Sequence, residues 1–153
     1  MLRQILVAFV LVAINVSIHA SGMVALFQWV AGRVGRVRKE FGPRAEIWLL
    51  IRIFAFIISL HLAQICAWAG FYTLWGGLEN FETSLYFSIA SYTTIGYGDI
   101  VLSPRWRLLG GIEGVTGVLM FGWSTGAIFA VASRLLSIPS EWSEAKQGHK
   151  AES

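Results

Sequence analysis

The sequence predicts an all-α membrane protein with three transmembrane helices and one short helix that enters the membrane without crossing it. Of the 153 residues, 56% are hydrophobic and only 14% are charged, whereas soluble domains carry about 25% charged residues. Three apolar segments, within residues 1–31, 47–74 and 107–135, each exceed the roughly 20 residues that a helix needs to cross a bilayer. The apolar run at 81–93 is too short to span, and so it is expected to be the re-entrant helix.

The first segment, residues 1–31, is expected to be a retained N-terminal transmembrane helix. A secretory signal peptide is the alternative, because Arg3 precedes an apolar stretch that ends in SIHAS. The apolar character continues through MVALFQWVA, however, and Ile18 fits poorly at the third position before such a cleavage site. Both features favour the retained helix.

The connector at 32–45 is expected to be cytoplasmic. It holds five basic residues and one acidic residue: Arg33, Arg36, Arg38, Lys39, Arg44 and Glu40. Because basic loops stay on the cytoplasmic side, the N-terminus is expected outside, residues 72–107 outside and the tail at 136–153 inside. Arg105 and Arg107 on the outer side weigh slightly against this orientation. The basic residues therefore indicate a membrane surface as partner rather than nucleic acid.

Between the short helix and the third transmembrane segment lies TTIGYGD, residues 93–99. Irregular backbone at membrane depth survives only where it is buried in protein or lines a water-filled cavity. Successive carbonyls can face one axis only if the backbone alternates between normal and positive φ, and glycine adopts positive φ freely. Gly96 and Gly98, spaced by two, meet this requirement, so their carbonyls could replace the water around a cation. An ordinary turn between two membrane helices is the alternative.

TTIGYGD resembles the selectivity-filter signature of tetrameric potassium channels, in which rings of backbone carbonyls replace the hydration shell of the ion. FETSLYFSIASY is similar to the pore helix of that family, and RWRLLGGIEGVTGVLMFGWSTGAIFA is similar to its inner helix. The resemblance covers roughly residues 46–135. It implies a pore domain made of four parts: an outer helix at 47–74, a pore helix at 81–93, an extended selectivity filter at 94–98 and an inner helix at 107–135.

The same resemblance implies the partners. One chain supplies one filter strand, and the motif is not repeated in the sequence. The family therefore implies a tetrameric pore of four identical subunits, in contact with membrane lipids and potassium ions. It implies no nucleic acid partner and no cofactor apart from the permeant ion.

The resemblance also implies roles for single residues. Potassium ions would bind at Thr94, Ile95, Gly96 and Tyr97, with Gly98 completing the oxygen donors. Asp99 would lie at the outer mouth, and Thr93 and Glu113 would support the filter. Five positions of the inner helix match the cavity or gate of the family: Gly117, Val118, Phe121, Gly122 and Thr125. The two glycines of that set are either flexible points or sites of close helix packing.

Ala90 departs from the pattern of the family, and Glu113 is an unusual residue for a spanning segment. Some members pair a pore-helix glutamate with the filter aspartate, and the matching position here is Ala90. Glu113 is the only acidic residue within a spanning segment, and an intramembrane carboxylate is a candidate for function. We expect Glu113 behind the filter, protonated or hydrogen-bonded to pore-helix groups such as Ser88, Ser91 or Tyr92. A carboxylate at the interface that reaches the outer water is the alternative.

His61 and Gln64 share one face of the second transmembrane helix. Polar contacts to Asn15 and His19 of the first helix, or to a neighbouring subunit, are expected. A metal site or a proton relay is the alternative.

Taken together, the residues and the resemblance indicate a potassium-selective channel subunit of the cell membrane that lets potassium flow passively. A weakly selective cation channel and a non-conducting membrane subunit are the alternatives. An enzyme is not expected, because the sequence holds no His-Glu-x-x-His or Gly-x-Ser-x-Gly motif.

Overall fold

The computed structural model describes residues 2–33 and 43–137, and within these ranges the regular structure is entirely helical. The helices are α1 (Leu2–Ala31), α3 (Pro43–Leu74), α4 (Phe81–Tyr92) and α5 (Arg107–Ser137). The three long ones, α1, α3 and α5, are apolar and long enough to cross a membrane, which confirms the predicted all-α fold with three candidate spans. Most of the basic connector (34–42) and of the tail (138–153) lies outside the described residues.

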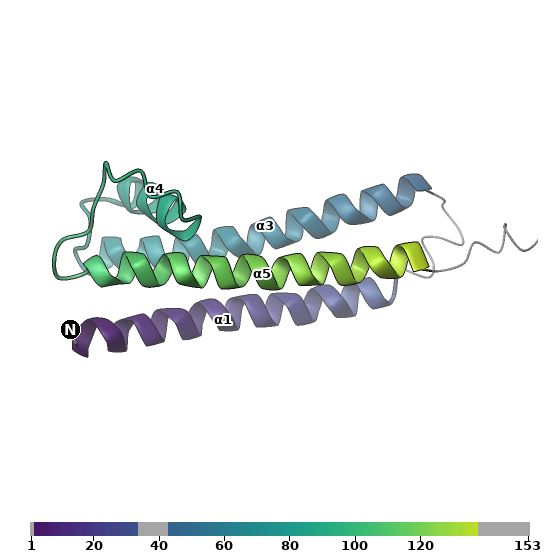
Figure 1. Cartoon of the computed structure of the whole chain (residues 1–153), viewed down its shortest axis with the longest axis horizontal. Helices are drawn as coiled ribbons and strands as arrows, with labels where there is room; N and C mark the ends of the chain where they lie inside the picture. The colour runs from purple at the N-terminus through teal and green to yellow at the C-terminus, as the bar shows by residue number, and fades with distance from the viewer. Residues whose placement is uncertain (1, 34–42, 138–153) are drawn as a thin grey trace, which may run out of the picture.

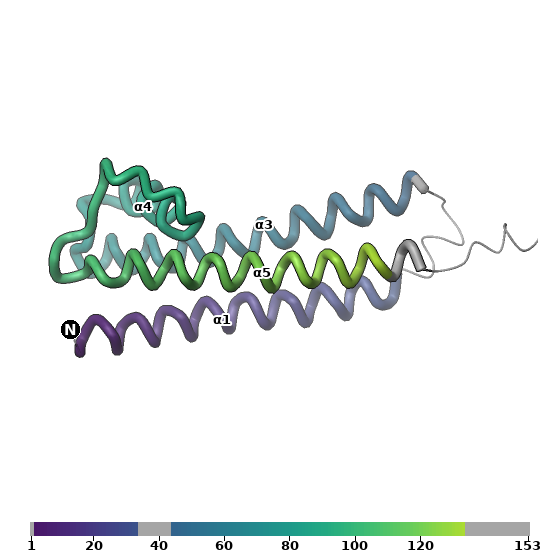
Figure 2. The backbone as a smooth tube through the Cα atoms, in the orientation of Figure 1, coloured from purple at the N-terminus to yellow at the C-terminus, as the bar shows by residue number. Residues whose placement is uncertain are grey.

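The three long helices lie side by side in an elongated bundle, and α4 lies at the end that holds the N-terminus (Figures 1 and 2). The Gln4 side chain of α1 donates hydrogen bonds to the backbone carbonyls of Pro104 and Arg105, just before α5. The start of α1 and the loop after α4 therefore share one end of the bundle. The sequence predicts the same arrangement, and which end faces the cytoplasm stays a prediction from the basic connector.

At the end away from α4, the three long helices share one apolar core. Its buried members are Met23, Leu26, Val30, Leu49, Ile53, Ile57, Ala127 and Val131. Gly22 lets α1 and α3 approach, since a Cβ placed there would lie 2.4 Å from a terminal carbon of Leu60. Small residues that permit such approach drive helix packing in membranes, where lipid removes the usual hydrophobic gain.

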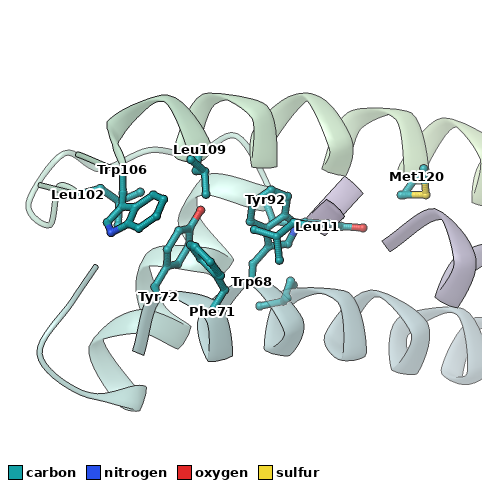
Figure 3. Close-up of a cluster of buried hydrophobic side chains, with 10 residues drawn as sticks. Leu11, Trp68, Phe71, Tyr72, Tyr92, Leu102, Trp106, Leu109 and Met120 are labelled. Atoms are coloured by element: carbon teal, nitrogen blue, oxygen red, sulfur yellow. The ribbon is translucent and has the colours of Figure 1, made fainter. Parts of the chain in front are cut away.

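A second core joins all four helices and the loop before α5 (Figure 3). Trp68, Tyr72 and Trp106 are buried almost completely in it. The Trp106 ring meets the Phe71 ring edge-on at 5.2 Å, and Leu102 of the same loop is also buried. This core fixes the path of the chain from α4 to α5.

Local sequence explains both ends of α4. Asn80 caps the N-terminus, where its Oδ1 accepts a hydrogen bond of 2.8 Å from the Thr83 amide. At the other end Thr93 is the C-cap, and its hydroxyl donates to the Ile89 carbonyl at 2.6 Å. The helix therefore stops at Tyr92, one residue before the predicted end at 93.

Candidate functional site

The backbone directly after α4 alternates in conformation. Thr94, Gly96 and Gly98 have φ of 60°, 55° and 79°. Positive φ at the two glycines confirms what their spacing predicts. Thr94 was not foreseen, because a β-branched side chain is strained at positive φ. Every second residue of segment 94–98 thus has the φ that lets successive carbonyls share a direction.

Backbone bonds to the C-terminus of α4 hold the Thr94 end of this segment. The Thr94 amide donates to the Ser91 carbonyl and the Gly96 amide donates to the Ala90 carbonyl, each at 3.0 Å. The last carbonyls of a helix lack partners within the helix, and these two bonds satisfy two of them. Ala90 therefore contributes through its backbone, although its side chain offers no charge.

Tyr86 of α4 holds the end of this segment near Asp99. Its hydroxyl donates a hydrogen bond of 2.8 Å to Asp99 Oδ2, and its ring stacks on Tyr97 with centroids 6.3 Å apart. The hydrogen bond to the Asp99 carboxylate raises the pKa of the Tyr86 hydroxyl above its ordinary value. Sequence reasoning missed Tyr86. The signal was present, because Tyr86 lies four residues before Ala90 and so on the same face of α4.

Segment 94–98 and Asp99 are exposed in the single chain. The side chains of Ile95 and Tyr97 are 55% and 68% exposed. Beside them runs a groove of about 490 Å³ between α4 and α5, lined by Ala90, Ser91, Thr94, Gly96, Gly110, Gly111, Gly114, Val115, Val118 and Leu119. Irregular backbone of this kind needs a cover of protein or an aqueous cavity at membrane depth.

Glu113 is fully buried on α5, behind α4. Its Oε2 accepts a hydrogen bond of 2.9 Å from the hydroxyl of Tyr72, which points toward α5 (Figure 3). Ser88 interacts with the same carboxyl, but within the described chain neither Ser88 Oγ nor Glu113 Oε1 makes a hydrogen bond of normal geometry. Burial contradicts the alternative of a carboxylate in the outer water. The hydrogen-bond donor is Tyr72 rather than Ser91 or Tyr92.

The two glycines singled out in α5 differ in their surroundings. A Cβ at Gly117 would lie 2.0 Å from the carbonyl oxygen of Tyr92, so this glycine permits close contact between α5 and the end of α4. At Gly122 a Cβ would meet none of the described atoms within 4 Å. Of the two readings of Gly117, the geometry supports close packing.

The other three inner-helix positions also differ. Val118 and Thr125 are exposed in the single chain. Phe121 is 37% exposed, and its ring lies 4.7 Å from the His61 ring and 5.5 Å from the Tyr92 ring. Phe121 therefore packs partly against the protein interior.

His61 and Gln64 of α3 lie inside the bundle. Gln64 Nε2 lies 2.9 Å from His19 Nδ1 and donates to the Asn15 carbonyl at 3.4 Å, which confirms the expected contacts to the first helix. Among the residues that the structure describes, no group of three metal-ligating side chains gathers, so the metal alternative has no support there.

A protein-family model described as an ion channel matches residues 46–134, more than half of the chain. The chain therefore belongs to this ion channel family. It is a multi-pass membrane protein and a channel, not an enzyme. No curated protein and no solved structure matches it.

Proposed function

We propose that the chain is one subunit of a homotetrameric potassium-selective channel, and that residues 94–98 form its filter. The observation that carries the proposal is the alternation of positive φ at Thr94, Gly96 and Gly98. Oxygens of residues 94–97 would bind potassium in place of its hydration water, and potassium would flow passively down its gradient.

The surface of the single chain supports an assembly. Four filter strands are needed to surround an ion, and each chain carries one. The groove between α4 and α5 and the exposed Ile95 and Tyr97 offer a surface for another copy. Copies related by rotation would close into a ring. The filter would then line the aqueous axis, which is where irregular backbone is tolerated.

Other residues take supporting roles in this proposal. Asp99 would lie at the outer mouth, held there by Tyr86. Glu113 would support the filter from behind α4, through Tyr72 and Ser88 rather than by touching segment 94–98. Val118, Gly122 and Thr125 would face the inner cavity. The N-terminus would lie outside the cell and the C-terminus in the cytoplasm.

A weakly selective cation channel is the second candidate. It requires the same family but not a regular filter, and the Gly-Tyr-Gly sequence together with the alternating φ favours the selective channel. A non-conducting subunit would need no exposed filter backbone at all.

The test is the reversal potential of the purified protein in planar bilayers. A selective channel should shift its reversal potential by about 59 mV for each tenfold potassium gradient, and a sodium gradient should leave it unchanged. Gly96→Ala should abolish this behaviour, because alanine is strained at a φ of 55°. Val101→Ala, at an exposed loop position, is the matched control.

Two results would contradict the proposal. Equal reversal potentials in potassium and sodium gradients would indicate the weakly selective channel. The absence of current, with intact protein in the bilayer, would indicate the non-conducting subunit.

A further inference from the structure

Five buried side chains from all four helices form a closed ring of hydrogen bonds inside the bundle. Their exposed fractions run from 0% to 8%. The ring joins Gln64 Nε2 to His19 Nδ1 (2.9 Å), His19 Nε2 to Ser124 Oγ (3.4 Å), Ser124 Oγ to His61 Nε2 (3.0 Å), His61 Nδ1 to Tyr92 Oη (3.0 Å) and Tyr92 Oη to Gln64 Oε1.

One contact outside the ring fixes the orientation of Gln64. Its Nε2 also donates to the backbone carbonyl of Asn15 at 3.4 Å. A carbonyl can only accept, so the amide nitrogen must face it, and Oε1 must face the Tyr92 hydroxyl. The opposite orientation would set two acceptors against each other. Gln64 therefore donates a hydrogen bond to His19 and accepts one from Tyr92.

The orientation of the Gln64 amide determines where each proton of the ring lies. His19 accepts at Nδ1, so a neutral imidazole carries its proton on Nε2 and donates to Ser124. The Ser124 hydroxyl then donates to His61 Nε2, which leaves the proton of His61 on Nδ1, facing Tyr92. The Tyr92 hydroxyl donates to Gln64 and closes the ring. All bonds run in one direction, with two neutral histidines in opposite tautomers.

One member of the ring, Tyr92, lies just before segment 94–98 in the sequence. Tyr92 is the last residue of α4, and its carbonyl lies against Gly117 of α5. The next residue, Thr93, caps the helix, and the positive φ values begin at Thr94. A shift of the Tyr92 side chain would therefore move the start of this segment. Buried polar groups left without partners are costly, so a closed ring resists such a shift.

We propose that this ring positions Tyr92 for conduction, and that His19 of α1 is a positioning residue for the filter although it does not touch it. The role in conduction rests on the proposed function. α1 therefore helps to position the filter, because His19 is linked to it through Gln64 and Tyr92.

The first experiment needs no current. Nitrogen-15 spectra of histidine-labelled full-length protein in lipid bilayers distinguish the two neutral tautomers. We expect the His19 signal of the Nε2–H form and the His61 signal of the Nδ1–H form, assigned with the His19→Gln and His61→Gln variants. Tyr92→Phe removes one acceptor and one donor of the ring, and it should shift both signals. Two histidines in the same tautomer, or charged at neutral pH, would overturn the ring.

The second experiment measures the ratio of open to closed time in single-channel records. His19→Leu removes both bonds and should lower this ratio by roughly tenfold, on the scale of one or two lost hydrogen bonds. His19→Gln keeps one acceptor and one donor, so it should restore much of the ratio and keeps the test valid if the leucine variant does not fold. Val24→Ala, on the exposed side of α1, is the control.

The positioning role of His19 and the proposed channel function can be contradicted separately. A wild-type ratio in His19→Leu overturns the positioning role. If Tyr92→Phe and His19→Leu act through one ring, the double variant should show less than the product of the two single effects. A full product would also overturn it. If the wild-type protein passes no potassium current, the proposed function fails, while the tautomers still decide whether the ring exists.

Discussion

Tyr86 contacts Asp99 from α4, whose position 90 holds an alanine and so offers no carboxylate. A pore-helix carboxylate at position 90 would have to share a proton with the aspartate to bond with it. The Tyr86 hydroxyl instead donates to Asp99 Oδ2 directly. Its ring also stacks on Tyr97, so one side chain braces two residues of the motif.

Tyr86→Phe should weaken the Asp99 end of the proposed filter at neutral pH. We expect the lifetime of the open state to fall by roughly threefold, because one exposed hydrogen bond is lost and the stacking is kept. Single-channel records with the outer solution at pH 7 measure this, and Val101→Ala serves as the control.

Alkaline pH should act on the same bond in the wild-type protein. The folded pKa of Tyr86 is raised above 10.0, so the bond is fully present below the ordinary pKa and is lost as the pH rises through the raised value. The wild-type lifetime should approach that of Tyr86→Phe above pH 10, whereas the variant should change little there. A wild-type lifetime that is constant through this range would contradict the role of the bond.

Some residues of the site were predictable from the sequence, and the reasons are local. Glycine is the residue that adopts positive φ freely, so Gly96 and Gly98 could be assigned from their spacing. Thr94 could not, because a β-branched residue disfavours positive φ, yet Thr94 has a φ of 60°. Tyr72 as the partner of Glu113 depends on how α3 meets α5, which the order of residues does not reveal.

At the scale of elements, the apolar runs predicted the helices better than their ends. The second helix was predicted from residue 47, where the apolar run begins, but α3 begins at Pro43. Proline suits the first turn of a helix, and a helix can continue past the apolar region into the interface. The end of α5 at Ser137 likewise lies beyond the predicted 135. Hydropathy reports the membrane depth of a segment, whereas hydrogen bonding decides where the helix stops.

The contact of α5 with α4 depends on Gly117. Gly117→Ala would place a methyl group on the Tyr92 carbonyl, where 2.0 Å is available, and backbone cannot move aside cheaply. We expect a loss of about 1–3 kcal/mol or more from overpacking, larger than the roughly 1 kcal/mol that alanine gains over glycine in a helix. Thermal unfolding of the purified protein in detergent measures the difference.

Gly126→Ala is the matched control on the same helix. A Cβ at Gly126 meets none of the described atoms within 4 Å, so this variant should be neutral or slightly stabilising. If Gly117 were a flexible point without close contact, both variants would raise the stability. Equal shifts of the two unfolding temperatures would therefore refute the packing role.

At the scale of the whole molecule, a single chain leaves its most distinctive backbone uncovered. Segment 94–98 is exposed, and the groove beside it is lined largely by glycine and small apolar residues. Such surfaces in a membrane invite close helix packing, because small residues let backbones approach. The sequence predicted this need for partners from the motif alone. The shape of the groove became visible only once α4 and α5 were placed together.

The groove gives a direct test of the assembly. Gly111 lines it, and a Cβ added there would meet none of the described atoms of other elements within 4 Å, so the position opens into the groove. Gly111→Trp should therefore leave the single chain folded but exclude a neighbour. Native mass spectrometry should find the wild-type protein at four times 16.9 kDa and the variant at the mass of one chain. Val24→Trp, which adds the same bulk to the exposed side of α1, should remain tetrameric.

Potassium should stabilise the wild-type assembly and not the variant. Ions bound between four chains favour the assembled state by mass action, by about 2.7 kcal/mol when potassium is present at 100 times its dissociation constant. The wild-type tetramer should thus dissociate at a higher temperature in potassium than in sodium, and Gly111→Trp should show no such difference. A tetramer that persists in Gly111→Trp with the same response to potassium would mean that the chains meet through another surface, because no neighbour could then occupy the groove.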